Sequence, residues 1–255
     1  MKKYKYVVAA GCSFTLDPPY NNELLHLPKD GKSYGRLISE YFGAKYYELA
    51  SPGYSLQGMH RKTLEWCSKN KDKFKDTLII FGVTSMGRAE IWNNKRKDWL
   101  DPNLIWHNDC RYFQSPDSLL DTFKDRLLIH WPSEQRKNYF INFYNTTSDF
   151  FLITQSIISL QSFLTLYNID HVFFDAYWRL AEEVIKKFNI KLEYQLLFDS
   201  LVSQENWYRH PEYTSMIDFL VQHPEMRHSR KDLHPNKEAH KYWAECLLEF
   251  INEKV

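Results

Sequence analysis

Short apolar runs alternate with helical patterns along most of this chain, and this alternation restricts the fold more than any other feature. The clearest run is Thr77–Val83 (TLIIFGV), which is apolar throughout, as in a strand buried on both faces. The clearest helical pattern lies near the C-terminus, where apolar residues between Ala239 and Ile251 recur at i, i+3, i+4 and i+7. Strands alternating with helices indicate a parallel sheet covered on both faces. The sequence therefore predicts a three-layer α/β/α sandwich.

The remaining elements follow from the same patterns. We expect further strands at residues 4–10, 45–50 and 171–175, and an edge strand at 192–197. We expect helices at residues 33–42, 56–67, 148–167 and 180–188, and we place Pro235 at the first position of the final helix. Residues 90–148 interrupt the rhythm, and we interpret them as an insertion over one end of the sheet. The length of 255 residues fits a single domain, at residues 1–255.

The carboxyl ends of the predicted strands are the first place to look for a site, because ligands bind there in open parallel sheets. The residues directly after the strands include several with reactive or polar side chains. They are Gly11-Cys12-Ser13, Ser51-Pro52-Gly53, Thr84-Ser85 and Ala176-Tyr177-Trp178.

Ser13 is a candidate nucleophile, because Gly11 allows the sharp turn that would present its hydroxyl. A serine here equally fits the cap of a helix or turn. At the other end of the chain, His234 precedes the final helix, and an imidazole is a suitable general base at neutral pH. Asp232 has the chemistry to hold the imidazole in one tautomer. Capping of the helix by Asp232 is an alternative, and it is compatible with catalysis.

Four short blocks together resemble the SGNH hydrolases, also called GDSL-like hydrolases. Their order along the chain and their places after strands or before the last helix agree with that family. The blocks are Gly11-Cys12-Ser13-Phe14, Ala50-Ser51-Pro52-Gly53-Tyr54-Ser55, Gly82-Val83-Thr84-Ser85 and Asp232-Leu233-His234-Pro235-Asn236.

The resemblance implies a flavodoxin-like sheet and hydrolysis of ester-linked acyl groups without a cofactor. It also implies a role for each matching residue. Ser13 would be the nucleophile and one donor to the oxyanion, and Gly53 would be a second donor. His234 would be the base and Asp232 the acid that orients it. The family includes bacterial and phage proteins whose first block reads GCSF.

Two positions depart from the family pattern. Thr84 stands where the family has an asparagine that donates to the oxyanion, so Thr84 or the adjacent Ser85 would have to replace that donor. The family acid usually lies three residues before the histidine, where this chain has Lys231. Asp232 lies two residues before it, and Asp175, at the end of a predicted strand, is the alternative acid.

Other residues have alternative interpretations. Cys12 is a stronger nucleophile than serine, but as the middle residue of its turn it should point away from the cleft. Arg88 offers paired donors for a carboxylate or phosphate, and an ion pair with Glu90 explains it equally well. We expect substrate contacts from Ser85, Arg88, Tyr177 and Trp178. We assign solvated or packing roles to His210, His223 and His228, whose spacing does not match that of metal ligands.

Aromatic side chains are frequent in this chain, with 17 Tyr, 17 Phe and 8 Trp, and many fall in the predicted insertion. Trp99, Trp106 and Trp131 have the ring faces needed to line a carbohydrate cleft. They would equally serve to pack the insertion onto the sheet, because aromatic side chains bury a large area. The packing interpretation is favoured, and a glycan ligand remains the alternative.

Composition and charge argue against several classes of protein. The net charge is +1 with Lys and Arg spread along the chain, so we expect no nucleic-acid or membrane partner. The four cysteines form no CxxC pair, which favours a reducing compartment and no bound metal. The apolar part of residues 7–12 is shorter than the roughly 7–15 residues of a signal peptide core. We therefore expect a cytoplasmic protein without a membrane-spanning segment.

Two classes of function remain. The first is a serine esterase acting on an acyl or acetyl ester, with a small molecule or a glycan as the esterified alcohol. The second is a binding or structural protein, glycan-binding or phage-associated, that kept the fold and lost the activity, as Thr84 in the third block suggests. A phosphodiesterase or nuclease is less consistent with the sequence, because no cluster of metal ligands is evident.

Overall fold

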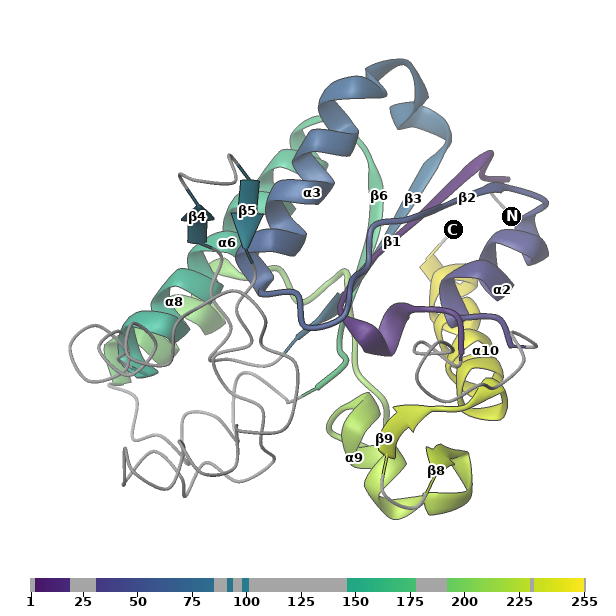
Figure 1. Cartoon of the computed structure of the whole chain (residues 1–255). Coiled ribbons are helices and arrows are strands. Elements are labelled where there is room, and N and C mark those ends of the chain that lie inside the picture. Colours follow the sequence, from purple (N-terminus) through teal and green to yellow (C-terminus); the bar gives the residue numbers. More distant parts are fainter. Residues whose placement is uncertain are drawn as a thin grey trace.

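The computed structural model describes residues 3–18, 31–84, 91–93, 98–100, 146–177, 192–229 and 232–254. A parallel sheet forms its centre (Figure 1), with the strand order β2-β1-β3-β6-β7. This is the doubly wound order of flavodoxin-like sheets, so the predicted fold class is confirmed. The strands are β1 (Tyr6–Ala10), β2 (Lys45–Glu48), β3 (Thr77–Val83), β6 (Asp170–Asp175) and β7 (Trp207–Tyr208).

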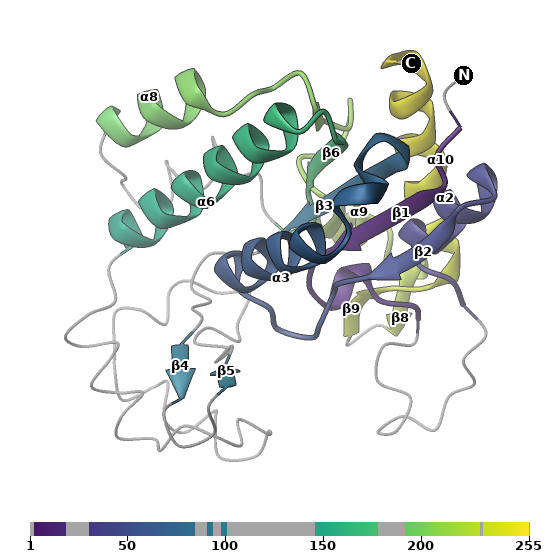
Figure 2. The ribbon, with the colours of Figure 1, turned by 90° about the horizontal axis from the view of Figure 1, so that it is seen from above.

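Helices cover both faces of this sheet (Figure 2). One face carries α2 (Tyr34–Phe42), α9 (Met216–Gln222) and α10 (Lys237–Lys254), and the other carries α3 (Leu56–Lys69), α6 (Thr146–Leu166) and α8 (Leu192–Leu201). Successive side chains of a strand point to opposite faces. Ile80 of β3 accordingly enters the core under α2 and α10, whereas Phe81 enters the core under α3 and α6.

Serine caps fix where α2 and α3 begin. Ser33 Oγ accepts the N–H of Arg36 at the start of α2, and Ser55 Oγ accepts the N–H of Gly58 at 3.0 Å at the start of α3. Helix α2 ends at Gly43, which adopts the left-handed φ of 63°. Helix α2 begins one residue later than expected from the sequence, because Ser33 is its cap, and α3 extends two residues further than expected.

Parts of the predicted insertion and one predicted helix lie outside the described residues. Within the insertion, β4 (Ile91–Asn93) and β5 (Asp98–Leu100) form an antiparallel pair. The helix expected at 180–188, together with Trp106 and Trp131, lies beyond the described ranges. The single-domain organisation remains a prediction.

The edge strand predicted at residues 192–197 is wrong, because these residues begin helix α8. Alternation of polar and apolar residues ends at Leu196, and the following Leu197 and Phe198 break it. Phe198 is fully buried and packs against Phe150 of α6 at 5.9 Å between ring centroids. The edge position is taken instead by β7, whose Trp207 stacks on Phe173 at 5.7 Å.

Helix α6 bears on the expectation that no segment spans a membrane. Its segment Ser148–Leu166 is long and apolar enough to cross a membrane, judged by length and composition alone. In this structure 44% of the segment is buried. Phe150, Ile153 and Ile157 enter the core over the sheet, so the apolar character of α6 is explained by its place in the sandwich.

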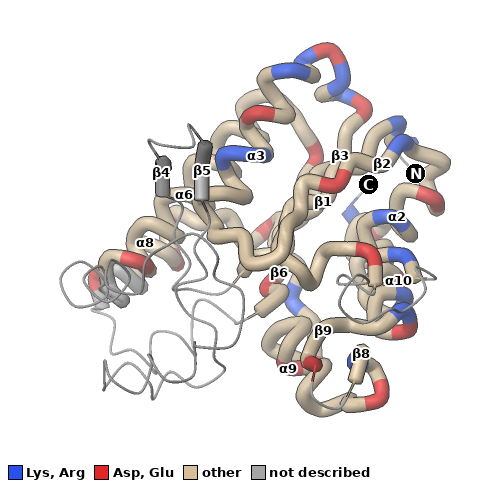
Figure 3. The backbone as a smooth tube through the Cα atoms, in the orientation of Figure 1, with Lys and Arg blue, Asp and Glu red and all other residues tan. Residues whose placement is uncertain are grey.

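Over the described residues, basic and acidic side chains are interspersed (Figure 3).

His240 is a buried histidine at the contact between α10 and α2. Its side chain is fully enclosed, and Nδ1 accepts the backbone N–H of Tyr34 at 3.2 Å. Burial disfavours the charged imidazole and lowers the pKa of His240 to about 3. The folded protein therefore holds this ring neutral at pH values where an exposed histidine would be protonated.

This burial predicts a pH dependence of stability. Between about pH 6.5 and pH 3, the unfolded chain binds a proton at His240 that the folded chain does not bind, so stability falls as the pH falls, by up to about 1.4 kcal/mol per pH unit from this group. His240→Asn keeps an acceptor for the Tyr34 N–H and removes the titration. Urea unfolding from pH 7 to pH 4.5 should give a shallower loss of stability for the variant. Parallel curves for the two proteins would contradict the assignment.

Candidate active site

Ser13 lies in a tight turn directly after β1. Residues Ser13–Thr15 form a short 3₁₀ helix, η1, in which the N–H of Thr15 donates to the carbonyl of Cys12 at 3.0 Å. A Cβ on Gly11 would lie 1.8 Å from Thr15 Oγ1, so only glycine permits the chain to turn this closely. Thr15 Oγ1 in turn accepts the hydroxyl of Tyr34 at 2.7 Å. This hydrogen bond joins the turn to helix α2.

A charged clamp, Asp17 with Arg36, joins the residues after this turn to the start of the same helix. The carboxylate of Asp17 accepts the backbone N–H of Ser33 at 2.8 Å and Nε of Arg36 at 2.7 Å. Burial alone would raise the pKa of Asp17, but hydrogen bonds from Arg36 and Ser33 outweigh burial and lower it. Sequence reasoning missed this clamp, because the two partners are 19 residues apart and belong to no recognised motif.

His234 is presented by an antiparallel hairpin of β8 (Arg227–Ser229) and β9 (Asp232–Pro235). Asn236 follows it and caps α10, accepting the N–H of Ala239 at 3.0 Å. The Asn236 amide also donates to the carbonyl of Glu225 at 2.8 Å. We expected Pro235 to be the first residue of α10, but it is the last residue of β9. The residue that caps α10 is Asn236 and not Asp232.

The hairpin brings His234 to Ser13, 221 residues away in the sequence. His234 Nε2 lies 2.8 Å from Ser13 Oγ, and His234 Nδ1 lies 2.5 Å from Asp232 Oδ1. The same carboxylate oxygen accepts the backbone N–H of His234 at 3.0 Å, and the N–H of Asp232 donates to Ser229 Oγ at 3.1 Å. Serine, imidazole and carboxylate thus form one continuous hydrogen-bonded chain.

The carboxylate of Asp232 is held in its charged form. Burial by itself raises the pKa of Asp232, but hydrogen bonding and charge attraction from His234 outweigh it and lower the pKa below its ordinary value. An ionised Asp232 accepts the Nδ1 proton of the imidazole. This leaves Nε2 as the acceptor that faces the hydroxyl of Ser13.

Two further blocks end at the same edge of the sheet. Gly53 is buried in the turn after β2 and adopts a φ of 76°. The N–H of Ser51 donates to the carbonyl of Gly11 at 3.3 Å, which ties this turn to the end of β1. Thr84 follows β3 directly and is 1% exposed. Ser13, Gly53 and Thr84 therefore follow three neighbouring strands at the edge where the switch in strand order places ligands.

Comparison with solved structures gives similar folds among hydrolases. Esterase EstA from Pseudoalteromonas sp., a member of the lipolytic G-D-S-L family from Veillonella parvula, and the alpha/beta hydrolase LAE5 from the Lake Arreo metagenome have TM-scores of 0.47, 0.47 and 0.48. Their sequence identities are 10%, 10% and 12%. The matches cover 98%, 96% and 98% of this chain and 97%, 96% and 96% of theirs.

No family model matches the sequence. No curated protein matches it either. At these identities and TM-scores, the activity of the chain has to be argued from its own residues.

Asp175, the alternative acid, has other partners. Its carboxylate accepts Nε1 of Trp207 at 3.2 Å and lies 3.7 Å from Nη1 of Arg209. It is Asp232 that contacts the imidazole of His234. Cys12, the alternative nucleophile, has no exposed surface and belongs to the core under α2 and α10, as its place in the turn led us to expect.

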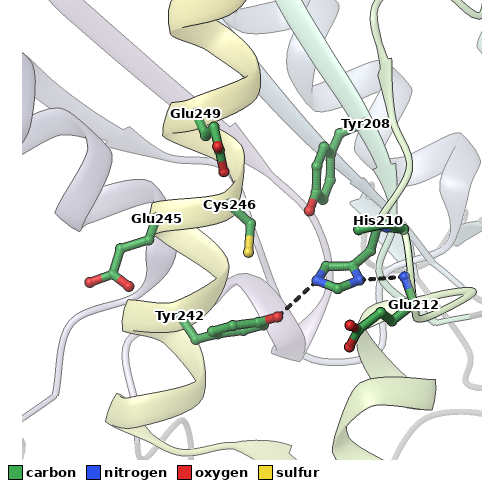
Figure 4. Close-up of a pocket in the computed structure, with 8 residues that line it drawn as sticks. Tyr208, His210, Glu212, Tyr242, Glu245, Cys246 and Glu249 are labelled. Carbon is green, nitrogen blue, oxygen red and sulfur yellow. Dashed lines mark hydrogen bonds between the residues drawn. The ribbon is translucent and has the colours of Figure 1, made fainter.

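His210 lines a pocket of about 410 Å³ between α10 and the residues that follow β7 (Figure 4). Its Nδ1 accepts the backbone N–H of Glu212 at 3.0 Å, and its Nε2 lies 2.8 Å from the hydroxyl of Tyr242. Burial lowers the pKa of His210. Because Nδ1 is an acceptor, the ring is neutral and joins the loop after β7 to α10.

The other two histidines of this region also lie outside the Ser13 chain of hydrogen bonds. His223 Nε2 contacts the hydroxyl of Tyr213 at 2.7 Å, and His228 lies on β8. Among the described residues, no group of three or more His, Cys, Asp or Glu side chains is placed to hold a metal ion.

The predicted substrate-contacting residues are only partly described. Ser85, Arg88 and Trp178 lie outside the described ranges. Tyr177 is described, and its ring contacts Phe14 at 5.7 Å between centroids. Phe14 itself contacts the imidazole of His234 at 5.1 Å. The sequence patterns assign no role to Phe14. Its position directly after Ser13 is the one sequence feature that points to a place in the site.

Proposed function

We propose that this protein is a serine ester hydrolase. The observation that carries the proposal is the continuous hydrogen-bonded chain from Ser13 Oγ through the imidazole of His234 to the carboxylate of Asp232. The 2.8 Å between His234 Nε2 and Ser13 Oγ is within the range in which a base can take a proton from a serine. The chain lies at the carboxyl edge of a doubly wound sheet, where ligands bind in such folds.

In the proposed reaction, Ser13 attacks the carbonyl carbon of an ester while His234 Nε2 takes the hydroxyl proton. The ester C–O bond then breaks, and His234 returns the proton to the leaving alcohol. Water then attacks the acyl carbon while His234 takes its proton. The bond from that carbon to Ser13 Oγ breaks, His234 returns the proton to Ser13 Oγ, and the acyl group leaves as a carboxylic acid. Asp232 stays ionised throughout and stabilises the imidazolium that forms twice in the cycle.

The oxyanion requires hydrogen-bond donors opposite the base. We assign the backbone N–H groups of Ser13 and Gly53 to this role, with Thr84 supplying the third donor. The support is positional, since all three follow neighbouring strands at one edge of the sheet. A buried threonine offers a hydroxyl donor in place of the family's amide, and Ser85 is the adjacent alternative.

The substrate class proposed first is an acetyl or other short acyl ester, with a carbohydrate as the alcohol. Its support is the aromatic content of the chain and the ring of Tyr177, which packs on the Phe14 ring that contacts the base. No cofactor takes part in the proposed reaction.

A fluorophosphonate probe tests the proposal without a choice of substrate. We expect stoichiometric labelling, mapped by peptide mass spectrometry to Ser13, because the probe reacts with base-activated serines. His234→Ala should lose the label while keeping its fold by circular dichroism. His223→Ala, which removes a histidine outside the hydrogen-bonded chain, should label normally. Folded protein that takes no label would favour the binding or structural function instead.

A further inference from the structure

Two aromatic rings extend the site from His234 toward the end of β6. Phe14 is 3% exposed and packs against the imidazole of His234 at 5.1 Å with an interplanar angle of 41°. The ring of Tyr177 meets Phe14 edge to face, at 5.7 Å and 81°. The three rings therefore form one row, with Phe14 in the middle. Edge-to-face packing of this kind favours one fixed arrangement.

The backbone fixes Tyr177 at the same edge of the sheet as Ser13. The N–H groups of Ala176 and Tyr177 both donate to the carbonyl of Val83, at 3.0 and 3.3 Å. Ile217 N–H donates to the carbonyl of Ala176 at 3.1 Å, which joins this turn to α9. Tyr177 is only partly buried, whereas Phe14 is enclosed. Of these two residues, only Tyr177 has substantial surface that a ligand can reach.

We infer that Tyr177 borders the subsite for the leaving alcohol, and that Phe14 is a positioning residue for the imidazole. The inference rests on the proposed ester hydrolysis. His234 must return its proton to the leaving oxygen, so the alcohol has to lie within hydrogen-bond reach of Nε2. The ring row begins at that imidazole and ends at Tyr177. An aromatic face in this place fits an alcohol that carries a ring, such as a sugar or a phenol.

The two residues then affect different steps of the reaction. In acylation, the bond from Ser13 Oγ to the acyl carbon forms, the bond to the alcohol oxygen breaks, and the alcohol leaves with the proton from His234. In deacylation, water replaces Ser13 on the same carbon, and the alcohol is no longer present. Tyr177 therefore acts in acylation only. Phe14 acts in both steps, because His234 transfers a proton in both.

The experiment separates the two steps with esters that share an acetyl group. With 4-nitrophenyl acetate, the burst of nitrophenol reports acylation and the steady phase reports breakdown of the acetyl-enzyme. We expect Tyr177→Ala to slow acylation by 4-nitrophenyl acetate about tenfold, to leave kcat/KM for ethyl acetate nearly unchanged, and to leave acetyl-enzyme breakdown unchanged. Tyr177→Phe keeps the ring and is the rescue variant, expected to restore the preference for 4-nitrophenyl acetate over ethyl acetate that Tyr177→Ala loses.

Phe14→Leu, checked for folding by thermal unfolding, should slow both acylation and acetyl-enzyme breakdown, with the same factor for both esters. Equal effects of Tyr177→Ala on 4-nitrophenyl acetate and ethyl acetate, or slower breakdown of its acetyl-enzyme, would overturn the inference while leaving the proposed function intact. A wild-type protein that forms no acetyl-enzyme and takes no fluorophosphonate would overturn both.

Discussion

Replacing Ser13 by alanine is expected to reduce the rate of ester hydrolysis about 10⁶-fold, the loss typical when a serine nucleophile with an engaged base is removed. The physical reason is that His234 Nε2, 2.8 Å from Ser13 Oγ, then has no hydroxyl to deprotonate. Residual hydrolysis would come from direct attack of water on the bound ester, with the oxyanion still stabilised by the remaining donors. The measurement is kcat for 4-nitrophenyl acetate, with the fold checked by circular dichroism.

Cys12→Ala is the matched control for this variant, because it changes the adjacent residue and tests the alternative nucleophile. Cys12 is fully buried, so we expect a modest loss of stability from the smaller side chain and little change in kcat. Hydrolysis that survives in Ser13→Ala and disappears in Cys12→Ala would reverse the assignment. Hydrolysis that survives in both would place the chemistry elsewhere.

The sequence predicts the sheet well where a strand is buried on both faces. The run Thr77–Val83 is observed with the predicted bounds, because helices cover both faces of the sheet at this strand and every residue in it is buried. Residues 192–197 show the opposite case. Their short alternation fits an exposed edge strand, but contact of Phe198 with Phe150 and Trp207 stabilises a helix there. Tertiary packing overrides a local pattern that is only a few residues long.

For the site, the sequence indicates which residues follow the strands but not how they are supported. Ser13, Asp232 and His234 were singled out from their chemistry and their places beside predicted elements. The hairpin that carries His234 was not predicted, since β8 and β9 have no more than four residues each. The Asp17–Arg36 clamp joins residues 19 apart in the sequence, and Phe14 packs on His234 from the other end of the chain. Neither contact follows from a spacing pattern within one helix or strand.

Asp232→Asn is expected to reduce kcat about 10⁴-fold, the size of loss seen when the acid of a serine triad becomes an amide. The asparagine keeps the shape of the side chain but can donate to Nδ1, which would leave the proton on Nε2, where it faces Ser13. The lowered pKa of Asp232 means that the wild-type carboxylate is charged at neutral pH, so the substitution also removes the charge that stabilises the imidazolium. Stability should change little, because Asp232 is partly exposed on its hairpin.

Asp175→Asn is the matched control, and the two variants should show opposite effects. Asp175 is 4% exposed and accepts Trp207 Nε1 at 3.2 Å, so its amide variant should lose roughly 1–3 kcal/mol of stability by weakening a buried charge-assisted hydrogen bond. Its kcat should stay within a few-fold of the wild type, because Asp175 does not orient His234. If Asp175→Asn instead lost kcat about 10⁴-fold at unchanged stability, the acid of the site would be Asp175. The pairing of Asp232 with His234 would then be a feature of the hairpin alone.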